Sequence, residues 1–311
     1  MHRSTKVLAG VLALSLLGTA CGGDDEDTDA RDDGRDGPAI VLGAQDFGES
    51  LILSEIYAGA LRDAGYRAET TEVGGLRDLL LGAFKSGDVN MAVDYVAAEL
   101  EFLNGGKGEA TSDVDATLEA LEPYLDDRGL VAARPADAVD TNAFVVTEET
   151  SEQRDISTLS DLAANGADLT LGAPPDCESN GFCIPGLRRV YGVDLSDDFT
   201  PLDFGLIPDA LDEGAIDVGV VTSTDGRLAD PDTGWVLLED DKGMFAADNV
   251  FPVLSRDLVD AYGRDLTDVL DDVSAELTTE DLVRMNKRFD VDRDDAEDIA
   301  EDWLGDHGFG G

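Results

Sequence analysis

Short apolar runs and stretches of helical spacing alternate along most of this chain. Residues 40–42 form a continuous apolar run, which is typical of a strand covered on both faces. Apolar positions then recur at helical spacing over 52–61, and Gly65 supplies a stop. Asp46 and Glu49 have the spacing of a capping box. The pattern predicts a strand, a ligand-facing turn and a helix whose N-terminus could hold a polar or anionic group. The alternative is an ordinary strand and helix with no ligand.

The same alternation continues to residue 304. Because strands alternate with helices, the predicted fold class is α/β with mainly parallel sheets and flanking helices. We expect Asp113 or Ser112 to cap a helix that Pro123 kinks or breaks, and Thr278 or Thr279 to cap a later one. Further strands are predicted at 67–73, 89–95, 141–147, 169–172, 235–238 and 249–254, and further helices at 76–85, 97–103, 114–128, 159–164, 184–191, 258–262, 269–277, 282–289 and 296–304.

Two segments in different halves of the chain have the same pattern. Residues 79–95 and 207–224 both run from a helix through a glycine stop to an apolar strand with a polar end. The polar ends are Asp94 and Tyr95 in the first and 222–225 in the second. Matching strand ends in two lobes imply a cleft between them. The alternative is that strand–helix–strand units resemble one another by default.

The first residues have the layout of a secretory signal. Residues 1–20 begin with basic side chains, continue with an apolar run over 7–17 and end in small residues before Cys21. The run is too short to span a bilayer permanently. Residues 18–21 resemble a lipobox, although Leu17 lies four places before the cysteine rather than three. We expect Cys21 to be lipidated; the alternative is an unmodified cysteine.

The segment after Cys21 is acidic and lacks large apolar residues. Half of the residues in 22–37 are Asp or Glu, which predicts a solvated tether over 21–37. A tether of this kind would hold a folded domain away from a membrane surface. The expected location is therefore extracytoplasmic, anchored to the outer face of the cell membrane.

The chain is strongly acidic throughout. It has 69 Asp and Glu against 22 Lys and Arg, for a net charge of −47. Such a charge repels phosphates and argues strongly against nucleic acid as a partner. Acidic residues spread over the whole chain are typical of a surface adapted to high salt. The alternative is an ordinary acidic secreted protein.

The two remaining cysteines lie six positions apart. In an exported chain, Cys177 and Cys183 are expected to form a disulfide in a Gly- and Pro-rich loop. A metal site is the weaker interpretation, because the chain has 2 histidines, His2 in the signal and His307 near the end. We therefore expect no metal and no cofactor.

Motifs for catalysis are missing from the sequence. It contains no G-x-S-x-G, H-E-x-x-H or P-loop, and its core has no histidine that could act as a general base. A secreted hydrolase that uses acidic residues remains the alternative, since Asp and Glu pairs are too abundant to single any out. The chain is not expected to be an enzyme.

Five stretches together resemble the solute-binding proteins of ABC importers, in the family that binds glycine betaine, choline and related osmoprotectants. The resemblance covers 39–308 and implies a two-lobed periplasmic-binding-protein clamshell of type II. It implies that the chain crosses between the two lobes twice, near 141 and near 248. Lobe 1 would be formed by 38–141 and 248–311, and lobe 2 by 142–247. The stretches are GAQDFGESLILSEIYAGAL, KSGDVNMAVDY, PGLRRVYGVD, STDGRL followed by VLLEDDKGMF, and the closing helix with Asp302, Trp303 and Leu304.

The resemblance also implies a ligand site, with one departure from the family. Members usually hold a trimethylammonium group in a cage of aromatic rings, and here only Tyr95 keeps its ring. Asp248 could replace ring faces as the partner of a cation, or could be a solvated acid. The predicted ligand contacts are Gln45, Tyr95, Asn142, Thr222, Ser223, Thr224, Asp248 and Asn249, with Ala98 where a threonine often stands.

The predicted function is an extracytoplasmic receptor of an ABC importer. It would act as a monomer, capture a small zwitterionic or cationic solute such as glycine betaine, and engage ABC permease subunits while a lipid anchor holds it to the membrane. The alternatives are a receptor for another betaine or an amino-acid derivative such as ergothioneine, and a sensing module with the same clamshell.

Overall fold

The computed structural model describes Arg35 and residues 37–309. The predicted signal peptide, Cys21 and the tether up to residue 34 lie outside these residues. The Arg35 N–H donates to the carbonyl of Gly65 at 2.8 Å, and its guanidinium lies 3.2 Å from the carboxylate of Asp265. The end of the predicted tether is thus bound to the folded part of the chain.

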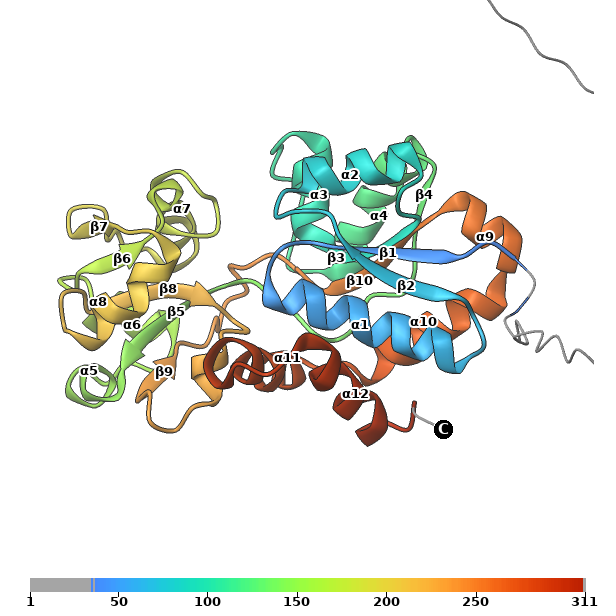
Figure 1. Cartoon of the computed structure of the whole chain (residues 1–311). Helices are drawn as coiled ribbons and strands as arrows, with labels where there is room; N and C mark the ends of the chain where they lie inside the picture. Colours follow the sequence, from blue (N-terminus) through green and yellow to red (C-terminus); the bar gives the residue numbers. More distant parts are fainter. Residues whose placement is uncertain (1–34, 36, 310–311) are drawn as a thin grey trace, which may run out of the picture. The chain divides into compact units, whose positions relative to one another are not determined.

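The first sheet has five strands, one of which comes from late in the sequence (Figure 1). Strands β1, β2 and β3 are parallel, and β10 runs antiparallel between β3 and β4. In sheet order the strands are β2 (Ala68–Glu72), β1 (Ile40–Ala44), β3 (Met91–Tyr95), β10 (Val250–Ser255) and β4 (Leu130–Ala132).

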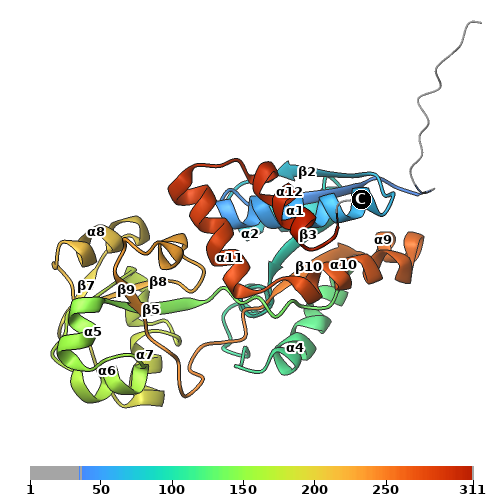
Figure 2. The same ribbon diagram turned by 90° about the horizontal axis from the view of Figure 1, so that it is seen from below.

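Helices cover both faces of the first sheet. One apolar cluster joins this sheet to α1, α10, α11 and α12, and a second joins its other face to α2, α3 and α4. Figure 2 shows α11 and α12 beside α1, which they contact. The helices are α1 (Gly48–Asp63), α2 (Arg77–Ser86), α3 (Val96–Asn104), α4 (Val114–Asp126), α9 (Arg256–Tyr262), α10 (Arg264–Glu276), α11 (Thr279–Asn286), η5 (Lys287–Asp292) and α12 (Ala296–Asp306).

The second sheet repeats this topology with a contiguous part of the chain. Strand β5 runs antiparallel between β8 and β9, whereas β6 is parallel to both β7 and β8. One antiparallel strand in each sheet confirms the expectation of mainly parallel α/β sheets. In sheet order the strands are β7 (Phe199–Pro201), β6 (Leu171–Ala173), β8 (Val218–Thr222), β5 (Asn142–Thr147) and β9 (Trp235–Leu237).

Short helices enclose the second sheet. One apolar cluster includes residues of α6, α7 and η2, and another includes residues of α8. The predicted helix over 184–191 is a single α-turn that continues as a π-helix. The helical segments are α5 (Glu148–Arg154), α6 (Leu159–Asn165), η1 (Pro175–Glu178), α7 (Ile184–Gly186), η2 (Leu187–Tyr191), η3 (Phe204–Leu206), α8 (Ile207–Asp212) and η4 (Gly226–Ala229).

Glycine is required where η4 meets the end of α11. A Cβ on Gly226 would lie 2.4 Å from the backbone nitrogen of Lys287 and 2.6 Å from the carbonyl carbon of Asn286. Because the obstacle is backbone, no rotamer change could relieve the clash. The connection between β8 and β9 of the second sheet therefore packs directly on the end of α11.

Two local predictions were wrong. Phe47, not Asp46, is the N-cap of α1, and no side chain caps this helix. Ser50 accepts a hydrogen bond from the Gln45 N–H at 2.9 Å, and the Glu49 carboxylate bonds to Tyr95 and Asn286 instead of capping the helix. Helix α4 is also not broken at Pro123, which removes one N–H donor, and it ends at Asp126 within the same turn.

Candidate functional site

The two chain crossings run side by side. Val139 and Asn249 form an isolated antiparallel bridge, and the Asp140 N–H donates to the carbonyl of Asp248 at 3.1 Å. The Ser223 N–H donates to the carbonyl of Thr141 at 2.7 Å, which ties the end of β8 to the same place. The crossings and the end of β8 therefore form one hydrogen-bonded unit.

A cavity of about 530 Å³ lies beside the crossings. Its walls come from the start of α3, the loop after α3, the crossings and the disulfide loop of the second half. Two predicted contacts, Asn142 and Asp248, are among its lining residues. The others are Ala97, Ala98, Glu101, Gly106, Gly108, Ala110, Thr141, Asn180, Gly181, Phe182, Arg189 and Ala246.

Asp248 places a carboxylate in this cavity. Its Oδ1 accepts a hydrogen bond from the Ala98 N–H at 2.9 Å, at the start of α3. Burial raises the pKa of Asp248 to about 7, against the opposing effects of that helix terminus and of Arg77. The protein's own carboxylate thus occupies the N-terminus of α3, and when ionised it offers a partner for a cation in a cavity that also holds Glu101 and Arg189.

Tyr95 and Thr224 belong to a buried hydrogen-bond network. The Tyr95 hydroxyl donates to Glu49 Oε1 at 2.5 Å, and Asn286 Nδ2 donates to Glu49 Oε2 at 2.5 Å and to the Thr224 carbonyl at 2.9 Å. The Thr224 hydroxyl donates to Asp140 Oδ1 at 3.0 Å. Burial raises the pKa of both Glu49 and Asp140, and the Glu49 carboxylate raises that of Asp140 further. The polar atoms of both predicted contacts therefore join elements of the protein to one another.

Two further predicted contacts bond to the backbone of the crossings. The Ser223 hydroxyl accepts from the Thr141 N–H at 3.0 Å and lies 3.2 Å from the carbonyl of Val139. The side chain of Asn249 donates to the carbonyl of Ala136 at 2.8 Å. These bonds fix the path of the chain between the two sheets.

Gln45 and Thr222 lie at strand ends outside the lining of the cavity. Gln45 directly follows β1 and is buried. Thr222 ends β8 opposite Asn142, its partner in the strand register. The structure thus brings Asn142 and Asp248 into the cavity, and the other six predicted contacts are not among its lining residues.

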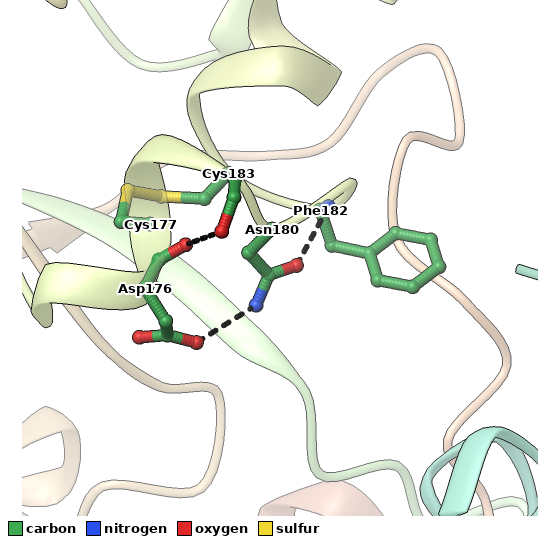
Figure 3. The surroundings of a disulfide bond; sticks show 6 residues. Asp176, Cys177, Asn180, Phe182 and Cys183 are labelled. Atoms are coloured by element: carbon green, nitrogen blue, oxygen red, sulfur yellow. Dashed lines mark hydrogen bonds between the residues drawn. A yellow bond between two sulfur atoms is a disulfide. The ribbon is translucent and has the colours of Figure 1, made fainter. Parts of the chain in front are cut away.

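The sequence did not single out three cavity residues, Asn180, Phe182 and Arg189. They lie in or just after the predicted disulfide loop, and the structure places a disulfide between Cys177 and Cys183, with Cα atoms 5.2 Å apart (Figure 3). The aromatic residue between two paired cysteines, next to PGLRRVYG, was the signal that could have identified Phe182.

Neither a metal centre nor a membrane span is found within the described ranges. Over Arg35 and 37–309 there is no group of three or more His, Cys, Asp or Glu residues that could hold a metal ion. In the same ranges, every helix is too short or too polar to cross a bilayer.

Two sheets of the same topology, with a cavity beside their crossings, define a solute-binding protein of the type II clamshell class. Residues 38–306 match the substrate binding domain of the ABC-type glycine betaine transport system, and the chain belongs to this family. The resemblance in the sequence and the predicted fold are confirmed. The protein is a solute-binding receptor of an ABC importer, in a family of extracytoplasmic binding proteins rather than enzymes.

Named relatives support this assignment. A glycine-betaine-binding protein of Pseudomonas aeruginosa is 27% identical over 285 residues, which cover 86% of this chain and 88% of the relative. The carnitine transport binding protein OpuCC of Listeria monocytogenes is 25% identical over 270 residues, or 85% of each chain. A crystal structure of a glycine betaine/carnitine/choline ABC transporter superposes with a TM-score of 0.75 at 26% identity, covering 88% of this chain and 98% of the other.

Proposed function

We propose that this receptor captures glycine betaine or a related osmoprotectant and delivers it to ABC permease subunits. The observation that carries the proposal is the carboxylate of Asp248 in the cavity, where it can attract a cationic head group. The named relatives bind or transport solutes of this kind.

The proposed binding region lies between two lobes, 38–141 with 248–311 and 142–247. Asn142 and Asp248 are the proposed direct contacts, since both line the cavity. We assign the role of shaping the site to the other predicted contacts, Gln45, Tyr95, Thr222, Ser223, Thr224 and Asn249. The hydrogen bonds of Tyr95, Ser223, Thr224 and Asn249 support this division.

Calorimetry with purified protein tests the proposal. We expect glycine betaine or another cationic or zwitterionic solute to bind at a single site, and proline to bind more weakly because it lacks a quaternary ammonium group. The panel is glycine betaine, choline, proline, ectoine and ergothioneine at one ionic strength, since salt screens the charge of the cavity. Absence of binding by every member would refute the proposed ligand class, and turnover of a member would restore the hydrolase alternative.

The proposed membrane anchor is Cys21, outside the described residues. Changing Cys21 to alanine should prevent lipid attachment and move the protein from the membrane fraction to the soluble fraction. Fractionation and mass spectrometry of the N-terminus measure both effects, and a Cys177→Ala variant serves as the control for loss of a cysteine. An unchanged partition would refute the anchor. The proposed functional unit is a monomer.

A further inference from the structure

Phe182 is an aromatic residue of the cavity without a partner in the apolar core. It is half-buried and lines the same cavity as Asp248. Over the described part of the chain, its ring belongs to none of the four apolar clusters and stacks on no other ring. A large ring left in a solute cavity is available to the solute.

The disulfide loop fixes the backbone on which this ring is carried. The Phe182 N–H donates to Asn180 Oδ1 at 2.9 Å, and the Cys183 N–H donates to the Asn180 carbonyl at 3.0 Å. Cys177 and Cys183 are both buried in the apolar cluster of the second sheet. Figure 3 shows the Phe182 ring projecting away from the disulfide. The loop is therefore anchored to the core while its ring is turned out of it.

The ring and the carboxylate together suit a cationic head group. An aromatic face attracts a quaternary ammonium ion, and a carboxylate in the same cavity adds a full negative charge. The other acid of the cavity, Glu101, is already engaged, since its two oxygens accept from the Gly108 and Ala110 N–H groups at 2.7 Å. Asp248 and Phe182 thus remain as complementary partners for a cation.

We propose that Phe182 is the aromatic contact for the cationic head of the ligand and that the Cys177–Cys183 disulfide positions it. This inference rests on the proposed function. It assigns an aromatic contact to the second half of the chain, where the predicted ligand contacts Asn142, Thr222, Ser223 and Thr224 carry no ring.

Substitutions at Phe182 test the aromatic contact with glycine betaine as the probe. Phe182→Ala should lower the affinity about tenfold. Phe182→Leu should lower it by nearly as much, because leucine keeps apolar volume but has no ring. Phe182→Trp should bind at least as tightly as the wild type. The control is Phe204→Leu, since Phe204 is 44% exposed and does not line the cavity. Equal affinity of wild type, Phe182→Leu and Phe182→Ala would overturn the contact.

A double-mutant cycle tests the positioning role of the disulfide. The double variant Cys177→Ala/Cys183→Ala should bind glycine betaine more weakly than the wild type. The same two substitutions should cause no further loss of affinity when Phe182 is already alanine. Equal losses in both backgrounds would overturn positioning and indicate a general structural role. Should the cysteine variant fail to fold by circular dichroism, Asn180→Ala takes its place in the cycle, because it removes the acceptor of the Phe182 N–H.

The outcomes separate this inference from the proposed function. If wild type binds glycine betaine and the Phe182 variants bind it equally well, only the inference fails. If wild type binds no solute of the panel, the proposed function fails and the inference fails with it.

Discussion

Replacing Asp248 with asparagine is expected to lower the affinity for glycine betaine about tenfold at pH 8. Asparagine keeps the shape of the side chain and can still accept the hydrogen bond from the Ala98 N–H, so the main loss is the negative charge. At pH 5.5 the two proteins should bind almost equally, because Asp248 is then largely neutral in the free receptor.

The pH dependence follows from the raised pKa of Asp248, which is about 7. Between pH 6 and pH 8 the ionised fraction of such a group rises about tenfold, and the affinity for a cation should rise with it. Arg77 lowers the pKa of Asp248, Asp94 raises it, and Asp140 is a further acid nearby. Binding of a cation below pH 7 should therefore release a proton.

Calorimetry from pH 5.5 to 8.5 in buffers of different ionisation enthalpy measures both the affinity and the proton release. The matched control is Asp260→Asn, which removes an exposed acid on α9 and should leave the pH profile unchanged. A profile of Asp248→Asn that rises as steeply as that of the wild type would show that another group controls binding.

Replacing Arg77 with alanine is expected to lower the free energy of unfolding by about 3 kcal/mol at pH 7. The guanidinium lies 2.6 Å from Asp94 Oδ1 and 3.5 Å from Glu99 Oε2, and the side chains of both acids are almost fully buried. Removing the cation leaves Asp94 buried without its ion pair, which costs much more than the pair itself contributes.

The loss of unfolding free energy in Arg77→Ala should grow from pH 7 to pH 9. Burial and Asp94 raise the pKa of Glu99 to about 8, while Arg77 lowers it. Because the folded pKa lies above the unfolded value, Glu99 lowers stability as the pH rises towards 8. Without Arg77 that pKa is higher still, so the destabilisation of the variant continues above pH 8.

Denaturant unfolding at both pH values measures this difference. Arg77→Lys should lose less than Arg77→Ala, because it keeps the charge without the planar fork. The control is Arg256→Ala, whose partner Asp126 is 67% exposed and whose ion pair should contribute less than about 1 kcal/mol. Similar losses for Arg77→Ala and Arg256→Ala would contradict the account.

Local features of the fold could be predicted from the sequence. The apolar run at 40–42 became β1, and Asp113 and Thr278 cap helices with their side chains, as expected. The two segments with the same pattern, 79–95 and 207–224, end in β3 and β8, and these strands occupy equivalent places in the two sheets. Strand periodicity and cap chemistry act over a few residues, so a short window contains the information.

The chemistry of the site depended on contacts between distant residues. Glu49 has the spacing of a capping residue, yet its carboxylate bonds to Tyr95 and to Asn286, which lies 237 positions away. The sequence places Phe182 between two cysteines expected to pair, but neither its lack of a core partner nor its cavity is visible there. Contacts between residues so far apart in the sequence depend on the tertiary structure.

The place of β10 in the first sheet sets the order in which the protein can be completed. Among the described residues, strand β4 pairs with β10 alone, and β10 is formed by residues 250–255. The edge of that sheet therefore has no partner until nearly the whole chain is available. The second sheet uses only 142–237 and can close earlier. When the chain is synthesised from its N-terminus, the first sheet therefore begins to form first but is completed last. Its apolar surface stays exposed to aggregation for longer than that of the second sheet.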